Sequence, residues 1–320
     1  METDSSLEDP ARTAVTQCLA LDPSESCVIV TDEKRRQIGE ALYEVASEIS
    51  DDAVIARYPP GDTHGSEPPA PVAAAMADAD VVLAPTTKSL SHTRARGAAN
   101  EAGARVATLP GVTPAVFTTG LDADYDEIAA RCADVLEQVD AADEVRVTGD
   151  GGTDITFDVA DREWNADTGI VHEPGEMSNL PAGEVFVSPE SATGTYVVDG
   201  TMMPHGLLAD GRTLTFTVED GLVTDISDDD IRETVETAAE EVGDAAYNVA
   251  ELGIGTNVAV TELVGSVLLD EKAAGTIHIA IGDDAGIGGD VEAPIHLDGI
   301  VRDVQVFADG AEVSLPDPDV

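Results

Sequence analysis

Four short apolar runs, separated by helical stretches, limit what the first half of this chain can form. The runs are SCVIVTD (26–32), AVIARY (53–58), VVLAP (81–85) and RVATLPG (105–111). The segments between them have helical character, and a long helical stretch follows the last run. Repeated strand and helix units favour a parallel sheet with crossover helices. No G-x-G-x-x-G follows the first run, which argues against a dinucleotide site.

The pattern changes near residue 145, where short strands separated by Gly/Asp turns begin. The segment EVRVTGDGGTDITFDVAD (144–161) is typical of a hairpin. Two helical stretches follow, at about 229–250 and about 258–273. We therefore predict an α/β, Rossmann-like domain with a parallel sheet over residues 1–145. An α+β domain with mainly antiparallel strands is predicted over residues 146–320.

The charge of the chain excludes some partners. The formal net charge is −48, from 64 acidic and 16 basic residues among 320. This field disfavours binding to nucleic-acid phosphates. Because concentrated salt screens self-repulsion, the composition predicts a halophilic protein. No run of about 18 apolar residues and no signal-peptide pattern occur, so we expect a cytoplasmic protein without membrane association, its three cysteines reduced.

Two strand-like segments carry a histidine on the face opposite an aliphatic wall. In GTIHIAIG (275–282) the isoleucines share one face and His278 lies on the other. In PIHLDG the same alternation places His296 and Asp298 on one face. If these polar faces converge, they form a ligand set for divalent zinc, manganese, cobalt or iron. The pattern alone fits ordinary half-buried histidines equally well.

Two glutamates extend this candidate set. Glu184 follows a Pro/Gly turn at the start of the apolar strand in LPAGEVFVSP. Glu251 is predicted to close the helix at 229–250 and leads into ELGIGTN. A glutamate among small apolar residues and glycine is unusual on a solvated surface. Both residues also fit the surface of a salt-adapted protein, so the sequence pattern leaves the choice open.

Four segments, GEVFVSP, ELGIGTN, GTIHIAIGD and IHLDGIV, together resemble the aminopeptidase T / aminopeptidase S family of metallopeptidases, in the same order. The resemblance covers about residues 145–310 and extends loosely into the first domain. It implies a two-domain, dimeric enzyme with a binuclear site that removes N-terminal residues from peptides. The metal ligands that it implies are Glu184, Glu251, His278, His296 and Asp298. It further implies a water activated by divalent zinc, cobalt or manganese, with Glu251 as the candidate proton acceptor.

The chain departs from these peptidases, and a second relative offers an alternative. No tyrosine follows His278 where the peptidases carry a catalytic one, and the spacing from His278 to His296 is short. The same superfamily includes 2,5-dihydroxypyridine dioxygenase, a mononuclear Fe(II) enzyme whose ligands match His278, His296 and Asp298. There a histidine from the first domain lies near the substrate, which makes His92 a candidate catalytic residue. His92 equally fits a helix N-terminus beside a serine.

Three hypotheses follow from these residues. A metal-dependent hydrolase resembling aminopeptidase T uses all five ligands, a ring-cleaving Fe(II) dioxygenase uses three, and a non-catalytic binding protein needs neither set. The two glutamates favour the hydrolase, because a two-metal site needs carboxylates and a facial triad does not. We expect a homodimer that acts on a peptide or small-molecule substrate.

Overall fold

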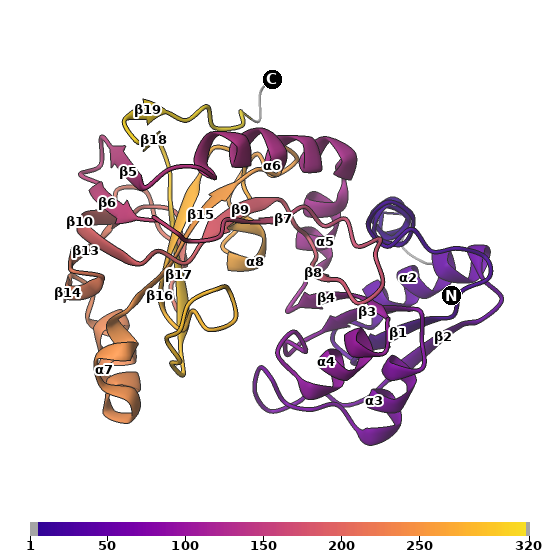
Figure 1. The fold of residues 1–320 in the computed structure, drawn as a ribbon. Coiled ribbons are helices and arrows are strands. Elements are labelled where there is room, and N and C mark those ends of the chain that lie inside the picture. Colours follow the sequence, from indigo (N-terminus) through magenta and orange to yellow (C-terminus); the bar gives the residue numbers. More distant parts are fainter. Residues whose placement is uncertain (1–5, 318–320) are drawn as a thin grey trace. The chain divides into compact units, whose positions relative to one another are not determined.

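The computed structural model describes residues 6–317, which divide into two compact units (Figure 1). Unit 1 runs to residue 129 and includes 167–182, and unit 2 contains 130–166 and the chain from 183 onward. The prediction places a single boundary at 145/146, whereas the chain passes between units within α6 (Tyr125–Val139) and later returns to unit 1. The return occurs because β8 (Met177–Asn179) pairs with β4 (Arg105–Pro110). The outermost predicted residues, 1–5 and 318–320, lie outside the described part.

Unit 1 is built on a parallel sheet of five strands in the order β2-β1-β3-β4-β8, which confirms the predicted parallel sheet. Its remaining strands are β1 (Cys27–Thr31), β2 (Ala53–Arg57) and β3 (Val81–Thr86). Its helical elements are α1 (Glu8–Arg12), the π-helical η1 (Thr13–Cys18), α2 (Arg36–Ile49), α3 (Ala70–Ala77), α4 (Arg94–Glu101) and α5 (Pro114–Leu121). Helix α5 is absent from the sequence prediction, which assigns no helix or strand to residues 112–121.

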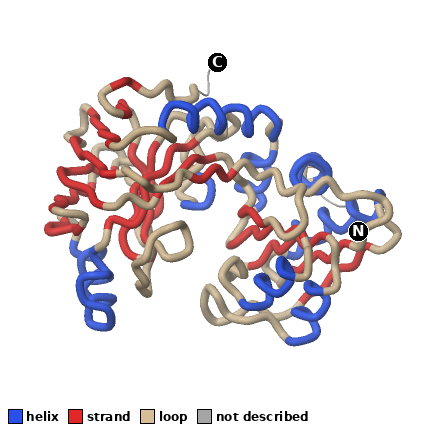
Figure 2. The backbone as a smooth tube through the Cα atoms, viewed as in Figure 1, coloured by secondary structure: helices blue, strands red, loops and turns tan. Residues whose placement is uncertain are grey.

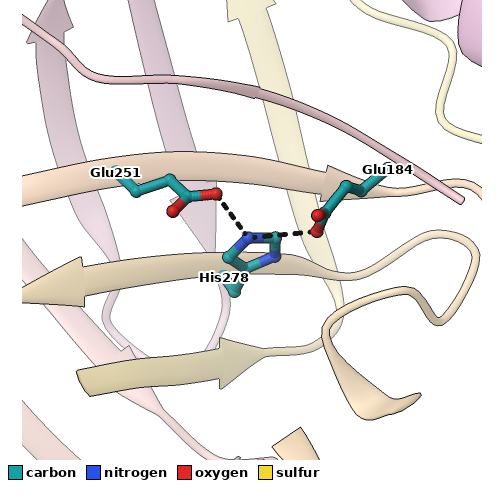
Figure 3. A group of neighbouring side chains, drawn as sticks. All are labelled: Glu184, Glu251 and His278. Carbon is teal, nitrogen blue, oxygen red and sulfur yellow. Dashed lines mark hydrogen bonds and ion pairs between the residues drawn. The ribbon is translucent and has the colours of Figure 1, made fainter. Parts of the chain in front are cut away.

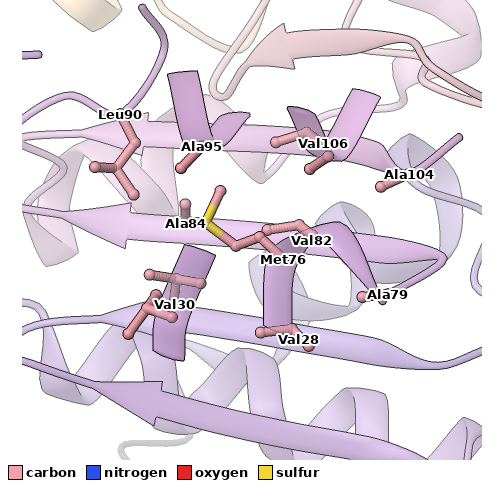
Figure 4. Close-up of a cluster of buried hydrophobic side chains, with 12 residues drawn as sticks. Val28, Val30, Met76, Ala79, Val82, Ala84, Leu90, Ala95, Ala104 and Val106 are labelled. Atoms are coloured by element: carbon pink, nitrogen blue, oxygen red, sulfur yellow. The ribbon is translucent and has the colours of Figure 1, made fainter. Parts of the chain in front are cut away.

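The core of unit 1 is aliphatic. Every residue of β1 and β3 is buried, as expected for parallel strands that are covered on both faces. Figure 4 shows Val28, Val30, Val82 and Ala84 of these strands around Met76 of α3. Alanine, valine and methionine fill this space without polar atoms, so its packing follows directly from the apolar runs of the sequence.

Unit 2 contains two seven-stranded sheets in which the paired strands run antiparallel, as predicted. The strands are drawn in red in Figure 2. The β6 sheet contains β14 (Leu222–Ile226), β13 (Leu214–Glu219), β10 (Ser191–Val198), β6 (Asp154–Asp158), β5 (Glu144–Gly149), β18 (Val304–Ala308) and β19 (Ala311–Glu312), in this spatial order. The β16 sheet contains β12 (Gly206–Leu207), β11 (Thr201–Met202), β17 (His296–Val301), β16 (Ile277–Gly282), β15 (Val249–Gly255), β9 (Glu184–Val187) and β7 (Asn165–Asp167).

Both predicted helices of unit 2 need correction. The first is α7 (Asp229–Val242), which the Asp228 side chain caps by accepting from two backbone N–H groups. It ends at Gly243, whose φ of 65° suits glycine, and a 3₁₀ turn, η2 (Gly243–Tyr247), follows before β15 begins. The second stretch, 258–273, contains only the short α8 (Val267–Asp270).

Within residues 6–317, no helix has both the length and the apolar character that a membrane crossing requires.

Candidate metal centre

Four neighbouring strands of the β16 sheet bring the five predicted ligands to one face. Paired residues of antiparallel strands point to the same side, and the register pairs Glu251 with Ala280, and Ala280 with Asp298. By the same register His278 lies opposite Gly253, and His296 lies opposite Gly282. Glu184 pairs with Gly255, two residues beyond Gly253 on the same face of β15. The predicted convergence of the two histidine strands is therefore present in the fold.

Small residues beside the ligands make the space that the ligands fill. A Cβ on Gly253 would overlap the imidazole ring of His278, so the ring occupies the volume that glycine leaves open. Ala280, which is also small, lies between Glu251 and Asp298 in the register. The alternation of functional and small residues across the strands places polar side chains close together without steric conflict.

The ligands form two groups that share Glu251. In the first, His278 Nε2 lies 3.2 Å from Glu251 Oε1 and 3.5 Å from Glu184 Oε2 (Figure 3). In the second, His296 Nε2 lies 3.2 Å from Glu251 Oε2 and 3.3 Å from Asp298 Oδ1. We call these the Glu184 side and the Asp298 side of the centre. The predicted triad of His278, His296 and Asp298 thus occurs divided between the two sides, with Glu251 between them.

The two sides differ in exposure. The side chains of Glu184 and Glu251 are each 8% exposed, and that of His278 is 1% exposed. The side chain of His296 is 33% exposed, because β17 begins at the surface and is buried only from Gly299 onward. The Asp298 side is the part of the centre that a solute can approach.

Glu251 reaches this position from a strand and not from the end of a helix, as the sequence prediction had it. It lies in β15, where a bulge between Val249 and Glu251 shifts the register. An alanine-rich stretch precedes β15, and its helical character extended the predicted helix to residue 250. Its apolar, glycine-rich surroundings made Glu251 a candidate ligand in the sequence, and the structure places it in this cluster from a strand.

Two further residues of the centre, Glu271 and Lys272, were missed by the sequence analysis. The Lys272 ammonium forms an ion pair with Glu184 Oε1 and lies 2.8 Å from Glu271 Oε1. Their segment crosses β15 at Gly255, where a Cβ would overlap the Ala273 carbonyl oxygen. The one sequence signal was that glycine, because the adjacent acidic and basic residues resemble an ordinary surface turn.

Charges within the cluster shift the titration of its members. Burial raises the pKa of Glu184 to about 8, against the opposing effect of Lys272. Burial also acts to raise the pKa of Glu251, but hydrogen bonds from both histidines hold that pKa well below its usual range. Burial acts to lower the pKa of His278, yet the hydrogen bond to Glu251 and nearby carboxylates raise that pKa to about 9.

On the Asp298 side, the pKa of the histidine is raised and the pKa of the carboxylate is lowered. Burial acts to lower the pKa of His296, but Asp298 and Glu251 raise that pKa well above its usual range. Burial acts to raise the pKa of Asp298, and His296 lowers that pKa overall. Without a metal ion the imidazoles are thus held as cations by the carboxylates. A divalent cation binding here would displace those protons.

The donor set fits a divalent metal ion. Donors bound about 2.1 Å from one ion at right angles lie roughly 3.0 Å apart, close to the separations observed in both groups. His296 Nδ1 lies 2.7 Å from the Asp283 carbonyl oxygen, so Nδ1–H donates there and Nε2 is directed to the centre. Glu184 Oε2 is buried without a hydrogen-bond partner. Imidazole and carboxylate donors suit zinc, manganese, cobalt and iron.

Hydrogen bonds hold the loop that joins β16 to β17 in place. Asp284 is 3% exposed, and its carboxylate accepts from the Val291 backbone, the Ser188 hydroxyl and the Asn248 amide. The same loop supplies the Asp283 carbonyl that orients His296. Its structural role is therefore to fix a ligand.

His92, the predicted catalytic residue of the alternative, belongs to unit 1. It is exposed in a turn after β3, and α4 is capped by the next residue, Thr93, whose hydroxyl accepts from Arg96 N. The prediction of a serine cap is thus corrected to threonine. Near this end of the sheet, Asp32 accepts hydrogen bonds from Thr87 N at 2.5 Å and Oγ1 at 2.9 Å. A catalytic part for His92 stays a prediction.

A third group of metal-capable residues consists of His205, Asp228 and Asp230. His205, which the sequence analysis left aside, lies 2.9 Å from Asp228, and Arg212 lies 3.0 Å from the same carboxylate. Asp228 also caps α7. These partners account for the group without a bound ion.

Comparison with known families identifies the chain. Residues 11–315 match the family model described as NicX: 2,5-dihydroxypyridine 5,6-dioxygenase. The chain belongs to this family. The family is named for an enzyme, and the matched range includes all five predicted ligands, Glu271 and Lys272.

Two solved structures share the fold of this family member. One is 2,5-dihydroxypyridine dioxygenase from Pseudomonas putida KT2440, with 18% identity, a TM-score of 0.80, and coverage of 100% of this chain and 98% of that one. The other is wild-type AmpT from Thermus thermophilus, with 17% identity, a TM-score of 0.66 and 97% coverage of each chain. These likenesses show a shared fold. A comparison with curated proteins gives no match.

Proposed function

We propose that this chain is a ferrous dioxygenase that opens a hydroxylated, nitrogen-containing aromatic ring. The observation that carries the proposal is the family match over residues 11–315. The match favours the dioxygenase alternative of the sequence analysis over its aminopeptidase reading. The absence of a tyrosine after His278 agrees with this preference.

The Asp298 side is the proposed position of the iron. His296 and Asp298 would hold it together with Glu251, and His278 adjoins the same glutamate. A bound ferrous ion would supply the redox chemistry that oxygen insertion requires. The Asp283 carbonyl fixes the His296 ring, and Glu251 holds both imidazoles at ligand spacing. The partial exposure of His296 leaves room for a substrate to approach.

A pocket on unit 2 suits a planar ring. It has a volume of about 380 Å³ and is lined by Phe186, Arg162 and the loop residues 286–288, among others. Phe186 pairs with Gly253 and therefore lies on the same face of the sheet as Glu184 and His278. An aromatic side chain there offers a face on which a substrate ring can stack. We propose this pocket as the ring-binding site.

The decisive experiment is anaerobic loading of the metal-free protein with Fe²⁺, followed by addition of 2,5-dihydroxypyridine and oxygen. We expect equimolar consumption of oxygen and ring, measured with an oxygen electrode and by the loss of ring absorbance. His296→Ala should abolish both consumption and iron binding while leaving the circular dichroism spectrum unchanged. His172→Ala, which removes an exposed imidazole, is the matched control and should retain both. Full iron occupancy in His296→Ala would contradict the assignment of the site.

A variant at the pocket tests the ring-binding site separately. Phe186→Ala should raise KM for the ring by roughly 10-fold, since aromatic pairs contribute about 0.5–1.5 kcal/mol beyond their buried area. Iron content should stay as in the wild type. An unchanged KM would exclude this pocket as the ring-binding site.

The aminopeptidase reading remains a second candidate because of one specific observation. Glu251 is shared by two ligand groups, which is how a carboxylate bridges a two-metal site. The structural likeness to AmpT agrees with that reading. The test is hydrolysis of aminoacyl p-nitroanilides by protein loaded with zinc, cobalt or manganese. Hydrolysis together with two bound ions would favour the peptidase over the dioxygenase.

A further inference from the structure

The burial of Lys272 is unusual for this chain. The sequence contains only three lysines, and Lys34 is exposed and Lys88 is partly so. The Lys272 side chain is 3% exposed and lies within the carboxylate cluster. A lysine is almost never buried this completely unless it is paired with carboxylates. Lys272 is therefore placed to act on those carboxylates.

The backbone fixes the position of this lysine. Asn257 N donates to the Lys272 carbonyl oxygen at 2.8 Å, and Asn257 forms an isolated bridge with Ala273. The absence of a side chain at Gly255 lets this segment lie against β15. These contacts are between main-chain atoms. They hold the backbone of Lys272 in place, so its ammonium stays within the carboxylate cluster.

Lys272 occupies a position that a second cation would need. Its ammonium binds Glu184 Oε1 and Glu271 Oε1, and the other oxygen of Glu184 faces His278 Nε2. A divalent ion on the Glu184 side would take Glu184 as a ligand and come close to this ammonium. Like charges repel strongly where burial lowers the dielectric response. On the Asp298 side, His296 forms ion pairs with both Glu251 and Asp298, and no lysine takes part in them.

We propose that the Lys272 ammonium takes the place of a second metal ion, so that the chain binds one divalent ion, on the Asp298 side. This inference rests on the metal site of the proposed function and deepens it. Lys272 is a positioning residue that holds Glu184 and Glu271 and limits the centre to one metal ion.

The test is the number of Mn²⁺ ions bound per chain, because Mn²⁺ is stable in air and has a distinct magnetic resonance spectrum. Metal-free protein is dialysed against Mn²⁺ and analysed for metal, and its spectrum is recorded. The wild type should bind one ion and give the spectrum of isolated Mn²⁺. Lys272→Gln should bind two ions, with the broadened signal of a coupled pair. Two ions in the wild type, or one in Lys272→Gln, would overturn the proposal.

Two controls separate charge from side-chain loss. Lys34→Gln makes the same substitution at an exposed lysine and should still bind one ion. Lys272→Arg keeps the charge and should also bind one. If Lys272→Gln does not fold, Lys272→Met, which keeps an unbranched side chain without the charge, replaces it and should bind two ions. Ring cleavage is not part of the measurement, so a failed dioxygenase assay with one bound Mn²⁺ would reject the proposed function and leave this inference standing.

Discussion

The two sides of Glu251 use the same types of residue for different purposes. On the Glu184 side, His278 is 1% exposed and a lysine already supplies a positive charge. On the Asp298 side, His296 is 33% exposed, and its Nδ1 is held by a backbone carbonyl. His278 Nδ1, in contrast, is buried without a hydrogen-bond partner. The same types of donor therefore form a closed, structural Glu184 side and an open Asp298 side that is suited to binding a metal ion.

Removal of the shared residue should have the largest effect, because it breaks both sides at once. In Glu251→Ala, both imidazoles lose their common carboxylate partner. We expect Mn²⁺ affinity to fall by roughly 100-fold or more, measured by isothermal titration calorimetry. Glu262→Ala removes an exposed glutamate of the same unit and should leave the affinity unchanged. A small loss in Glu251→Ala would mean that the two sides do not depend on the shared carboxylate.

Glu184→Gln should separate the sides when it is tested above pH 8, where Glu184 is charged and the variant removes a charge from the closed half only. Lys272 then keeps Glu271 but loses its buried partner Glu184. Breaking a buried ion pair costs about 3–5 kcal/mol, so the free energy of unfolding should fall by about that amount in urea titrations. Binding of one Mn²⁺ on the Asp298 side should persist.

The matched control for this variant is Glu190→Gln. Glu190 follows the same strand, its side chain is 66% exposed, and it pairs with Arg162 at 3.3 Å. An exposed pair contributes about 0–1 kcal/mol, so the control should be nearly neutral. Equal destabilisation in both variants, or loss of Mn²⁺ binding only in Glu184→Gln, would contradict the division into a structural and a binding half.

The Asp298 side was easier to predict from sequence than the Glu184 side, for a physical reason. Strand alternation is local, so His296 and Asp298 could be assigned to one face from their spacing alone. The parallel sheet of unit 1 could also be predicted from the sequence, because its buried strands β1 and β3 are continuous apolar runs. The position of Lys272 depends on a crossing at Gly255 between distant segments, and no local period encodes that crossing.

The helices of unit 2 show where the local sequence pattern predicted the wrong secondary structure. The alanine-rich segment before Glu251 continues the helical composition of α7, but Gly243 ends the helix through its positive φ. Residues 258–273 contain apolar residues at helical spacing, yet their backbone serves to carry Lys272 across the sheet. The first is a local stop at glycine, and in the second the tertiary contacts of the segment override helix propensity.

Gly253→Ala tests the closed side through packing and not through charge. The added methyl group would overlap the His278 ring, which must swing away from Glu251. We expect a loss of about 1–3 kcal/mol in unfolding free energy, measured by urea titration. Mn²⁺ affinity should fall less than in Glu251→Ala, because His296 and Asp298 are not displaced.

Gly97→Ala is the control for that substitution. Gly97 lies within α4, and a Cβ there meets no atom within 4 Å. Alanine is favoured over glycine inside a helix by about 0.5–1 kcal/mol, so this variant should be slightly more stable. If both glycine variants stabilise the protein, the His278 ring does not depend on the open space at Gly253.

Asp228→Asn should have the smallest effect and marks the contrast between the metal centre and a group that only resembles one. Burial acts to raise the pKa of Asp228, but hydrogen bonds from His205, the Ile231 backbone and Arg212 lower it to about 2. A lowered pKa stabilises the folded state above the ordinary value of 3.8, and this contribution is lost as the pH falls through about 2.

Asparagine keeps the helix cap but not the charge, so the Asp228→Asn variant should lose about 1 kcal/mol of unfolding free energy at neutral pH. Urea titrations at decreasing pH should show the difference shrinking below pH 3.8, with Mn²⁺ binding unchanged throughout. A loss of bound Mn²⁺ would instead make His205 and Asp228 part of a second metal site.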